Sequence, residues 1–515
     1  MICLRIIIRI RTIVKFRSPS FPLSPLCLLR PARKRAMLRL HIRRDGAAFH
    51  RERVYSLNII IAGAGKVGLT LAGRLSGEGH SVTVVDVSQQ ALDRAANQLD
   101  VMCVQGNGST RSTLLEAGAE GADVVIAATN SDENNLLCCH CAHLLGAGCT
   151  VARVRSVDYA GDLDYLKADL GIDLLVNPEL ATAREISRLL RFPGAAAVDT
   201  FARGRVEIAA FHVQPGDFVS GRSLAALASR LQDLPLLFCA VERGEQVVIP
   251  DGSFILSPGD QAYLAGTPAG ISQFFKLLGR HQHKLRSAFI IGGGRVAYYL
   301  LAILERLGMS CKVVERSEGR CRELAQRFPR SLVILGDGTD PELLEEEHLA
   351  SSDAFVALTD RDEDNLIISL YAHQCGVPKV VAKSSRHNYT AIARSAGVES
   401  VVSPKLITAD QILRLVRGIQ NSKGSAMTAL YRIADGRAEA MEFVADRSTR
   451  NLGQPLRALK LRRGVLIAVI VRAGKVIIPE GSTCLLEGDT VILVARDSGI
   501  LDLNDIYADA FGTGG

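Results

Sequence analysis

The sequence predicts an α/β protein made by tandem duplication of one unit, in which a doubly wound parallel sheet is followed by a small β-rich α+β domain. Three observations lead to this fold class. The same motifs recur in order in both halves of the 515-residue chain, apolar β-branched runs alternate with amphipathic helical stretches, and a glycine-rich turn follows the first strand of each half. Such alternation indicates βαβ crossovers and helices on both faces of a parallel sheet.

The internal repeat sets the domain organisation. Asn58–Gly68 (NIIIAGAGKVG) and Ser287–Ala297 (SAFIIGGGRVA) correspond at a displacement of 229 positions, from 58 to 287. Later matches keep the order: GNGST with GDGTD, ATNSDENNL with LTDRDEDNL, and IPDGSFILSPGD with IPEGSTCLLEGD. So many ordered matches indicate a duplicated unit of about 220 residues.

Each unit is expected to have two parts joined by a helix. Strands of the first parallel sheet are expected at 58–62, 81–85, 101–104, 123–127 and 150–154, with helices between them. The β-rich parts, each with one short helix, are expected at about 200–268 and 431–496, and the joining helices at Pro178–Arg191 and Pro404–Arg417. The resulting segments are a basic extension (1–56), a first nucleotide-binding sheet domain (57–178), a first small domain (195–278), a second sheet domain (286–404) and a second small domain (425–507).

Composition argues against several functional classes. Only 5% of the residues are aromatic and none is Trp, whereas single-stranded nucleic acids need rings on which bases stack. The net charge of +7 comes from the N-terminal segment, and the rest of the chain is mildly acidic, so a nucleic-acid partner is not expected. No apolar run reaches the roughly 18 residues of a membrane span.

The twelve cysteines show no disulfide framework, which fits a reducing cytoplasm. The strongest metal candidate is the cluster Cys138, Cys139, His140, Cys141 and His143. Adjacent helical side chains point about 100° apart, and no second pair completes a tetrahedral set, so no metal site is expected.

Residues 1–56 are rich in Arg and contain only two acidic residues, Asp45 and Glu52. A targeting peptide and a membrane-surface anchor are two interpretations. We favour a third, in which this basic extension is disordered or lies upstream of the true start, because a self-contained strand begins abruptly at Asn58.

The first half carries a dinucleotide fingerprint. Gly63, Gly65 and Gly68 form GxGxxG between a strand and a helix, and Asp86 closes the next strand. The glycines permit a tight turn, close approach of a pyrophosphate and close helix–strand packing. The helix N-terminus favours the diphosphate, while the acid binds ribose hydroxyls and repels a 2′-phosphate, so NAD(H) is favoured over NADP(H).

The second half repeats this Rossmann-like fingerprint with one change. Gly292 and Gly294 keep their places, Ala297 replaces the third glycine, and Glu315 supplies the acid. Alanine at the third position still permits close packing, so a second nucleotide site is predicted.

Further candidate residues follow later strands of each sheet. Thr129–Asn130 and Thr359–Asp360 come after the fourth strands, at the edge where ligands bind, with helix capping as the alternative role. Arg153 ends the fifth strand and is placed to face a phosphate, with an ion pair to another domain as the alternative. Lys383 takes its place in the second half and lacks the planar guanidinium fork.

These motifs, duplicated and each followed by a small β-rich domain, resemble the TrkA family. Its members are the peripheral NAD-binding regulatory subunits of the bacterial Trk potassium uptake system and are built of tandem RCK (KTN) domains. The resemblance covers about residues 57–505 and implies that each unit is an RCK N domain followed by an RCK C domain. Family members begin at the first strand, equivalent here to Leu57, in keeping with our interpretation of the extension.

The resemblance also implies a set of nucleotide contacts. In the first half they are Gly63, Ala64, Gly65, Lys66, Val67, Gly68, Asp86, Thr129, Asn130 and Arg153, and in the second Gly292, Gly293, Gly294, Arg295, Val296, Glu315, Thr359, Asp360 and Lys383. The departures at Ala297 and Lys383 leave the ligand and the occupancy of the second site open.

The resemblance implies a cytoplasmic regulator, bound to the cytoplasmic face of the inner membrane, that gates a potassium uptake transporter as its nucleotide changes. NAD(H) is the implied ligand, with ATP or ADP as further candidates. The implied partner is an integral membrane potassium transporter subunit of the TrkH or TrkG type, and the implied homo-oligomer is a dimer of internal pseudo-dimers.

Two other classes of function remain as alternatives. An NAD-dependent dehydrogenase needs an acid–base group near the nicotinamide. The small domains offer only the isolated polar residues His212, Glu242, Asp251 and Glu480, so no enzymatic activity is expected. A structural module that has lost its ligand is disfavoured, because the glycines and the acid are present in both halves.

Overall fold

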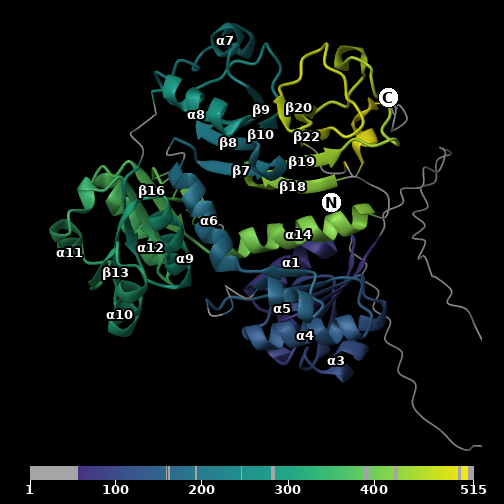
Figure 1. Ribbon diagram of the computed structural model, residues 1–515, viewed down its shortest axis with the longest axis vertical. Coiled ribbons are helices and arrows are strands. Elements are labelled where there is room, and N and C mark those ends of the chain that lie inside the picture. The colour runs from purple at the N-terminus through teal and green to yellow at the C-terminus, as the bar shows by residue number, and fades with distance from the viewer. Residues whose placement is uncertain are drawn as a thin grey trace, which may run out of the picture. The chain divides into compact units, whose positions relative to one another are not determined.

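The computed structural model describes residues 56–508 apart from 158, 160–162, 192–193, 245, 280–284, 387–388, 390–391, 394–395, 399, 423–426, 497–499 and 501. The described chain forms two six-stranded parallel sheets and two five-stranded antiparallel sheets, which alternate along the sequence (Figure 1). Except for Ser56, the expectation for the basic extension 1–56 lies outside the described residues.

The first sheet domain has the strand order β3-β2-β1-β4-β5-β6, the order of a doubly wound Rossmann sheet. Its strands are β1 (Asn58–Ala62), β2 (Ser81–Asp86), β3 (Met102–Gln105), β4 (Val124–Ala127), β5 (Thr150–Arg153) and β6 (Leu174–Val176). Its helices are α1 (Lys66–Gly77), α2 (Gln89–Gln98), α3 (Arg111–Glu116), α4 (Asp132–Leu144) and α5 (Leu163–Asp169), and α6 (Pro178–Arg191) leads out of it. Central strand β1 is apolar because helices cover both faces of the sheet.

The second sheet domain repeats this order as β14-β13-β12-β15-β16-β17. Its strands are β12 (Ser287–Ile291), β13 (Ser310–Glu315), β14 (Leu332–Leu335), β15 (Ala354–Ala357), β16 (Lys379–Lys383) and β17 (Ser400–Val402). Its helices are α9 (Arg295–Arg306), α10 (Glu318–Arg327), α11 (Pro341–Glu346) and α12 (Asp362–Gln374), and α14 (Pro404–Ser422) leads out of it.

The two small domains share the strand pattern β10-β9-β11-β8-β7 and β21-β20-β22-β19-β18, read from opposite edges. The first contains β7 (Ala197–Phe201), β8 (Val206–His212), α7 (Leu224–Leu231), β9 (Leu236–Arg243), β10 (Gln246–Val248), β11 (Gln261–Gly266) and α8 (Pro268–Leu277). The second contains β18 (Met427–Ile433), β19 (Ala438–Val444), η5 (Leu456–Ala458), β20 (Val465–Arg472), β21 (Lys475–Ile477), β22 (Thr490–Ala495) and η6 (Leu503–Ile506).

α14 extends to Ser422, beyond the expected end at Arg417, and the expected elements differ from the observed ones in two further places. β6 was not expected, because it has three residues, of which only Val176 is fully buried. The first small domain has two α-helices instead of one, and the described part of the second has only 3₁₀ helices. The reason for the second difference is local. Ser223 caps the Ala/Leu-rich segment of α7, whereas in the second half Pro455 precedes a shorter segment.

Helices α6 and α14 are exchanged between the two halves. Ile186, Leu189 and Leu190 of α6 pack in one hydrophobic core with α9 and the second parallel sheet. Ile412 and Leu413 of α14 pack in the core of the first parallel sheet, against α1. Each connecting helix is amphipathic and buries its apolar stripe on the sheet domain of the other half.

Polar contacts fix the same exchange. The Arg417 guanidinium of α14 donates to both carboxylate oxygens of Glu78, at 2.6 and 3.0 Å. Arg74 of α1 forms an ion pair with Asp410. Between the first half and the second sheet domain, the side-chain amide of Asn177, just before α6, donates to the Tyr299 hydroxyl of α9 at 3.0 Å in a buried environment. These paired groups make the packing of the exchanged helices directional.

The small domains also share one core. Residues of β8 and β9 pack with residues of β19, β20 and β22. The Tyr263 hydroxyl accepts a hydrogen bond from the Ala434 amide at 3.0 Å, and Glu442 accepts one from the Ala202 amide at 2.7 Å. The two halves are therefore joined at both levels, sheet domain and small domain.

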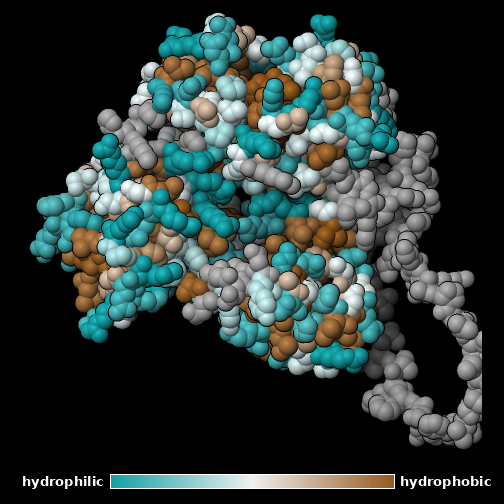
Figure 2. Space-filling model, in the orientation of Figure 1, coloured by the Kyte–Doolittle hydropathy of each residue, from teal (hydrophilic) through white to brown (hydrophobic). Residues whose placement is uncertain are grey.

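On the face shown in Figure 2, apolar residues form separate patches among polar ones, as is usual for a folded domain. Among the described residues, no helix combines the length and the apolar character needed to cross a bilayer.

The exchanged packing generates a prediction about stability. Ile412 is 1% exposed and lies in the core of the opposite half, so Ile412→Ala removes buried methyl groups and leaves a cavity there. We expect it to lower the free energy of unfolding by about 2–5 kcal/mol, measured by urea denaturation. Ile367 of α12 is 65% exposed, and Ile367→Ala is the matched control, with an expected change within about 0.5 kcal/mol. Equal effects of the two substitutions would show that α14 does not contribute to this core.

Candidate functional site

Both glycine-rich turns lie at the carboxyl edge of a parallel sheet, where the strand order reverses. The Gly63 amide donates to the Val85 carbonyl of β2 and the Ala128 amide donates to the Ala62 carbonyl of β1, both at 2.8 Å. The turn is therefore held between β2 and β4. In open α/β sheets this switch point is where ligands bind.

The three glycines of the first turn have separate structural roles. Gly63 has φ +111°, and a Cβ there would lie 2.9 Å from the backbone of Ala128 and Thr129. A Cβ on Gly68 would lie 1.8 Å from the Gly63 carbonyl oxygen, because α1 packs directly on the turn. A Cβ on Gly65 would meet no atom within 4 Å. The backbone at Gly65 thus borders open space into which only a ligand or solvent can reach.

The start of α1 is suited to an anion. No side chain caps the helix at Gly65, and its first turn has no acidic residue. The same holds for α9, which starts after Gly294. By contrast, the Ser88 and Ser131 hydroxyls cap α2 and α4. Uncapped amide groups together with the helix dipole provide the donors that a diphosphate needs.

In the first turns of α1 and α9, one side chain is exposed and the next is buried. Lys66 and Arg295 are exposed at the mouth of the two clefts. Val67 and Val296 are each 8% exposed and belong to the hydrophobic cores. The valines can therefore offer a ligand their backbone amides but little side-chain surface.

Asp86 is oriented by the first turn. One carboxylate oxygen accepts a hydrogen bond from the Ala64 amide at 2.7 Å, and the other accepts one from the Ser88 amide at 2.8 Å. The carboxylate is thus fixed at the end of β2, and each oxygen keeps a further lone pair for a ribose hydroxyl.

The second turn is built in the same way. Gly292 has φ +92°, and a Cβ on Gly294 would meet nothing within 4 Å. Ala297 is fully buried where the first half has Gly68. Glu315 accepts hydrogen bonds from the Gly293 amide at 2.7 Å and the Ser317 amide at 2.8 Å.

The second cleft carries two arginines that the sequence analysis did not single out. Arg320 of α10 donates through Nε to the Gly293 carbonyl at 2.7 Å, and Arg316 pairs with Asp337 at 2.7 Å. At the same displacement of 229, the first half has Ala91 and Val87. Their signal in the sequence is the segment ERSEGR, which starts at the acid Glu315 and places two basic residues after it. The second cleft therefore has two guanidinium groups near the ribose position that the first lacks, each paired with an acid, Asp337 and Glu323.

Thr129 and Arg153 are joined by a residue that the sequence analysis missed, Asn135. The Asn135 amide oxygen accepts from the Thr129 amide (2.8 Å) and hydroxyl (2.7 Å), and its nitrogen donates to the Arg153 carbonyl at 2.8 Å. Arg153 is 9% exposed and donates to the Thr129 carbonyl, while its buried Nε has no partner among the described residues. Asn130 lies exposed beside this network.

The second half repeats the network with Asn365. This side chain accepts from the Thr359 amide and hydroxyl, both at 2.8 Å, and donates to the Lys383 carbonyl at 3.0 Å. Lys383 donates to the Leu358 carbonyl at 3.3 Å and lies 3.8 Å from exposed Asp360. Burial lowers the pKa of the Lys383 ammonium. Asn135 and Asn365 occupy the same position of the two repeated blocks, which is the signal that would have found them.

Two members of the cysteine and histidine cluster of α4 lie in the hydrophobic core. Cys138 and Cys139 are buried, and burial raises the pKa of the Cys138 thiol to about 12. The His140 ring lies 3.0 Å from the Leu170 carbonyl. Among the described residues, no group of three His, Cys, Asp or Glu side chains is arranged to hold a metal ion.

The polar residues considered for a dehydrogenase lie in the small domains. Glu242 of β9 forms an ion pair with Arg437, and the Asp251 carboxylate accepts from the Ser253 hydroxyl at 2.6 Å. Asp251 and Glu480 line a cavity of about 740 Å³, and His212 ends β8. None of the four belongs to the strand ends or turns that form the nucleotide clefts.

Comparison with solved structures identifies the fold. The GsuK RCK domain superposes with a TM-score of 0.58 at 20% identity, covering 87% of this chain and 95% of that chain. A structure of the GsuK channel bound to NAD superposes with a TM-score of 0.56 at 20% identity, covering 87% and 78%. The chain therefore has the architecture of tandem RCK repeats.

Sequence comparison identifies the family. The TrkA-N domain model matches residues 59–178 and 288–404, and the TrkA-C domain model matches residues 208–279 and 440–507. Trk system potassium uptake protein TrkA homolog 1 of Methanosarcina mazei is 33% identical over 465 residues, which cover 88% of this chain and 100% of that protein. Trk system potassium uptake protein TrkA of Haemophilus influenzae is 32% identical over 449 residues, covering 86% and 96%. The chain belongs to the TrkA family.

Proposed function

We propose that this protein is a cytoplasmic NAD(H)-binding regulatory subunit that gates a membrane potassium uptake transporter of the Trk type through nucleotide-dependent conformational change. The observation that carries the proposal is the pair of glycine turns. Each borders open space at an uncapped helix N-terminus, with a fixed carboxylate at the end of the neighbouring strand. The names of the relatives supply potassium uptake as the process.

The donors of each cleft fit a dinucleotide. The amides at the start of α1 and α9 would hold its diphosphate, and Asp86 and Glu315 would bind an adenosine ribose. Arg153 contributes a buried guanidinium whose Nε is unpaired among the described residues. The solved GsuK channel with NAD bound has the same fold, in keeping with this assignment. In the second cleft, Arg316 and Arg320 favour a more highly charged nucleotide, such as ATP or ADP.

The exchanged helices α6 and α14 could transmit a displacement from a nucleotide cleft in one half of the chain to the other half. α1 begins at the first glycine turn and packs against α14, and α9 begins at the second and packs against α6. A nucleotide that changes the position of either helix must therefore displace an element of the other half. It can shift the conformational equilibrium only by the difference of its affinity for the two states. NAD(H) and ATP would therefore have to contact the two conformations differently.

The partner and the location follow from the family. We propose that the protein docks on an integral membrane subunit of the TrkH or TrkG type at the cytoplasmic face of the inner membrane. We also propose a homo-oligomer in which two internally duplicated chains associate. No enzymatic step is proposed, because Glu242 is held by Arg437 and the other polar residues considered lie outside the nucleotide clefts.

The first cleft is tested by Gly65→Asp. A Cβ at Gly65 meets no protein atom within 4 Å, so the variant should fold while its carboxylate enters the space proposed for the diphosphate. We expect calorimetric titration with NADH to give one site per chain instead of two. Gly77, at the end of α1, has equally open surroundings, so Gly77→Asp is the matched control and should retain both sites. Two sites in Gly65→Asp protein would overturn the assignment of the first cleft.

The second cleft is tested by Arg316→Ala/Arg320→Ala in the Gly65→Asp background. In that background the first cleft is expected to be blocked, so measured nucleotide binding comes from the second cleft. Loss of two charge-assisted contacts should weaken ATP binding by about tenfold or more, and NADH binding by less. The ratio of the two dissociation constants, measured by calorimetry, is the readout. An unchanged ratio would show that these arginines do not select the nucleotide.

The regulatory proposal is tested with the membrane partner in proteoliposomes. We expect potassium uptake to depend on this protein and to change when NADH is replaced by ATP. The Gly65→Asp/Gly294→Asp variant should bind the partner but lose the nucleotide response. Sustained consumption of NADH with a candidate substrate would favour the dehydrogenase alternative instead.

A further inference from the structure

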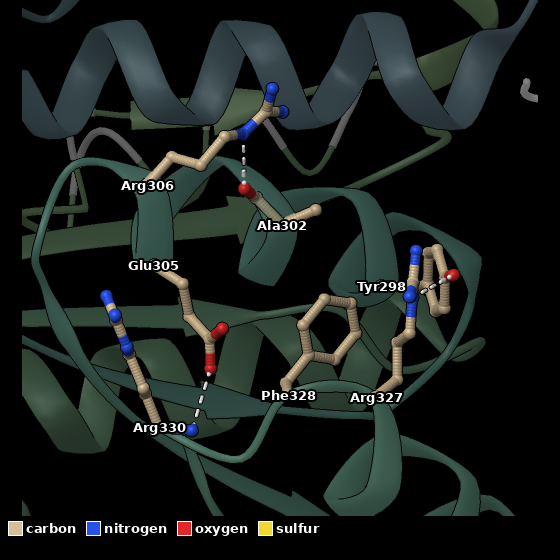
Figure 3. Close-up of a pocket in the computed structure, with 7 residues that line it drawn as sticks. All are labelled: Tyr298, Ala302, Glu305, Arg306, Arg327, Phe328 and Arg330. Atoms are coloured by element: carbon tan, nitrogen blue, oxygen red, sulfur yellow. Dashed lines mark hydrogen bonds between the residues drawn. The ribbon is translucent and has the colours of Figure 1, made fainter.

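We propose that the second sheet domain has an additional anion site, separate from the nucleotide cleft, that binds a small phosphate-bearing ligand. The site is a hollow of about 280 Å³ between α9, the end of α10 and the loop that joins α10 to β14. Arg306, Arg327 and Arg330 contribute to its walls together with Tyr298, Glu305 and Phe328 (Figure 3). In the close-up, Arg306 and Arg330 lie on the Glu305 side of Phe328, and Arg327 lies beside Tyr298 on the other side.

The Arg306 and Arg327 guanidinium groups each donate a hydrogen bond to an uncharged acceptor. The Arg306 Nε donates to the Ala302 carbonyl at 2.8 Å, and the Arg327 Nε donates to the Tyr298 hydroxyl at 3.1 Å. Both acceptors are uncharged. No ion pair reaches either of these guanidinium groups, or that of Arg330, from the part of the chain that the structure describes. Their remaining N–H groups are available to an external anion.

Glu305 is the one acid in the wall, and it has a structural task. One of its carboxylate oxygens accepts from the Arg330 amide at 3.2 Å and from the Ser331 hydroxyl at 2.8 Å. These bonds fasten the loop to α9 and thereby position Arg330. With three guanidinium groups and one carboxylate, the lining keeps a net positive charge.

The walls hold their shape without a ligand. Phe328 is 4% exposed, and its ring packs edge-to-face on Tyr298 with centroids 5.0 Å apart. The Arg320 guanidinium lies over the Tyr298 ring, 5.8 Å from its centroid. A binding site built on packed rings loses less conformational entropy when its ligand arrives.

Chemistry and size together point to phosphate. Guanidinium groups bind phosphate oxygens in bidentate fashion, and a tetrahedral phosphate has enough oxygens to engage more than one arginine. The hollow is at or below the small end of ligand pockets, roughly 300 Å³, so a small anion or a single headgroup fits it better than a whole dinucleotide.

The fold itself does not require these arginines. α1 and α2 of the first half correspond to α9 and α10 at a displacement of 229 along their whole lengths. There the positions of Tyr298, Glu305, Arg306 and Arg327 are occupied by Leu69, Ser76, Gly77 and Gln98. The same elements therefore form without these arginines, so the fold does not require the charge cluster.

The test uses the full chain saturated with NADH, so that the nucleotide clefts are occupied and cannot bind the phosphate probe. Pyrophosphate is titrated by calorimetry, and flotation is measured with vesicles of phosphatidylcholine alone or with one quarter phosphatidylglycerol. We expect binding of pyrophosphate or of the anionic vesicles. The Arg306→Gln/Arg327→Gln/Arg330→Gln variant should lose tenfold or more in affinity while keeping its NADH stoichiometry, which reports intact folding.

The charge-matched control is Arg94→Gln/Arg222→Gln/Arg322→Gln, which removes three exposed arginines elsewhere. It should change binding by less than twofold. Binding of pyrophosphate identifies a soluble phosphate ligand, whereas binding of the anionic vesicles alone identifies a lipid headgroup. The proposal is overturned if neither probe binds, or if the control loses as much affinity as the pocket variant. Because the readout is the difference between the two variants, it does not depend on the regulatory function proposed above.

Discussion

The structure depends on the reciprocal burial of two helices. α6 and α14 each carry an apolar stripe that is covered by the sheet domain of the other half. Separating the halves would expose both stripes and leave Glu78 and Arg417, which are paired across the exchange, without their partners. Burial of apolar area is the dominant favourable term in such packing. The two units therefore behave as one structural body, and the helices that start at the two glycine turns lie in shared cores.

The duplicated clefts have the same framework but different charge. Asn135 and Asn365 tie the ends of adjacent strands together in the same way, and Asp86 and Glu315 are fixed by the same kind of backbone amide. The differences lie in side chains that reach the rim, because the backbone geometry leaves them unconstrained. After duplication, one copy can maintain the shared core while the other acquires a different ligand preference. The basic hollow beside α9 is a second instance of such divergence.

Much of the fold was accessible from the sequence because the repeat supplied two independent copies of each signal. Strands β1 to β5 were predicted to within one residue at each end, since their apolar runs are bounded by glycine or polar residues. β6 was missed because a three-residue strand has no periodicity to detect. Only one helix was expected in the first small domain, because the Ala/Leu pattern of α7 has no counterpart in the second half.

By itself the sequence determined the repeat, the fold class, the glycine turns and the acids that follow them. The order of the motifs along the chain carries the repeat, and each turn and acid is a short local pattern. Only the tertiary structure decided the rest: that α6 and α14 exchange partners, that Asn135 links Thr129 to Arg153, and that Arg320 reaches Gly293. These contacts join residues from different elements. Which polar group meets which is set by the packing of helices on sheets, and the local pattern of a single element contains no record of it.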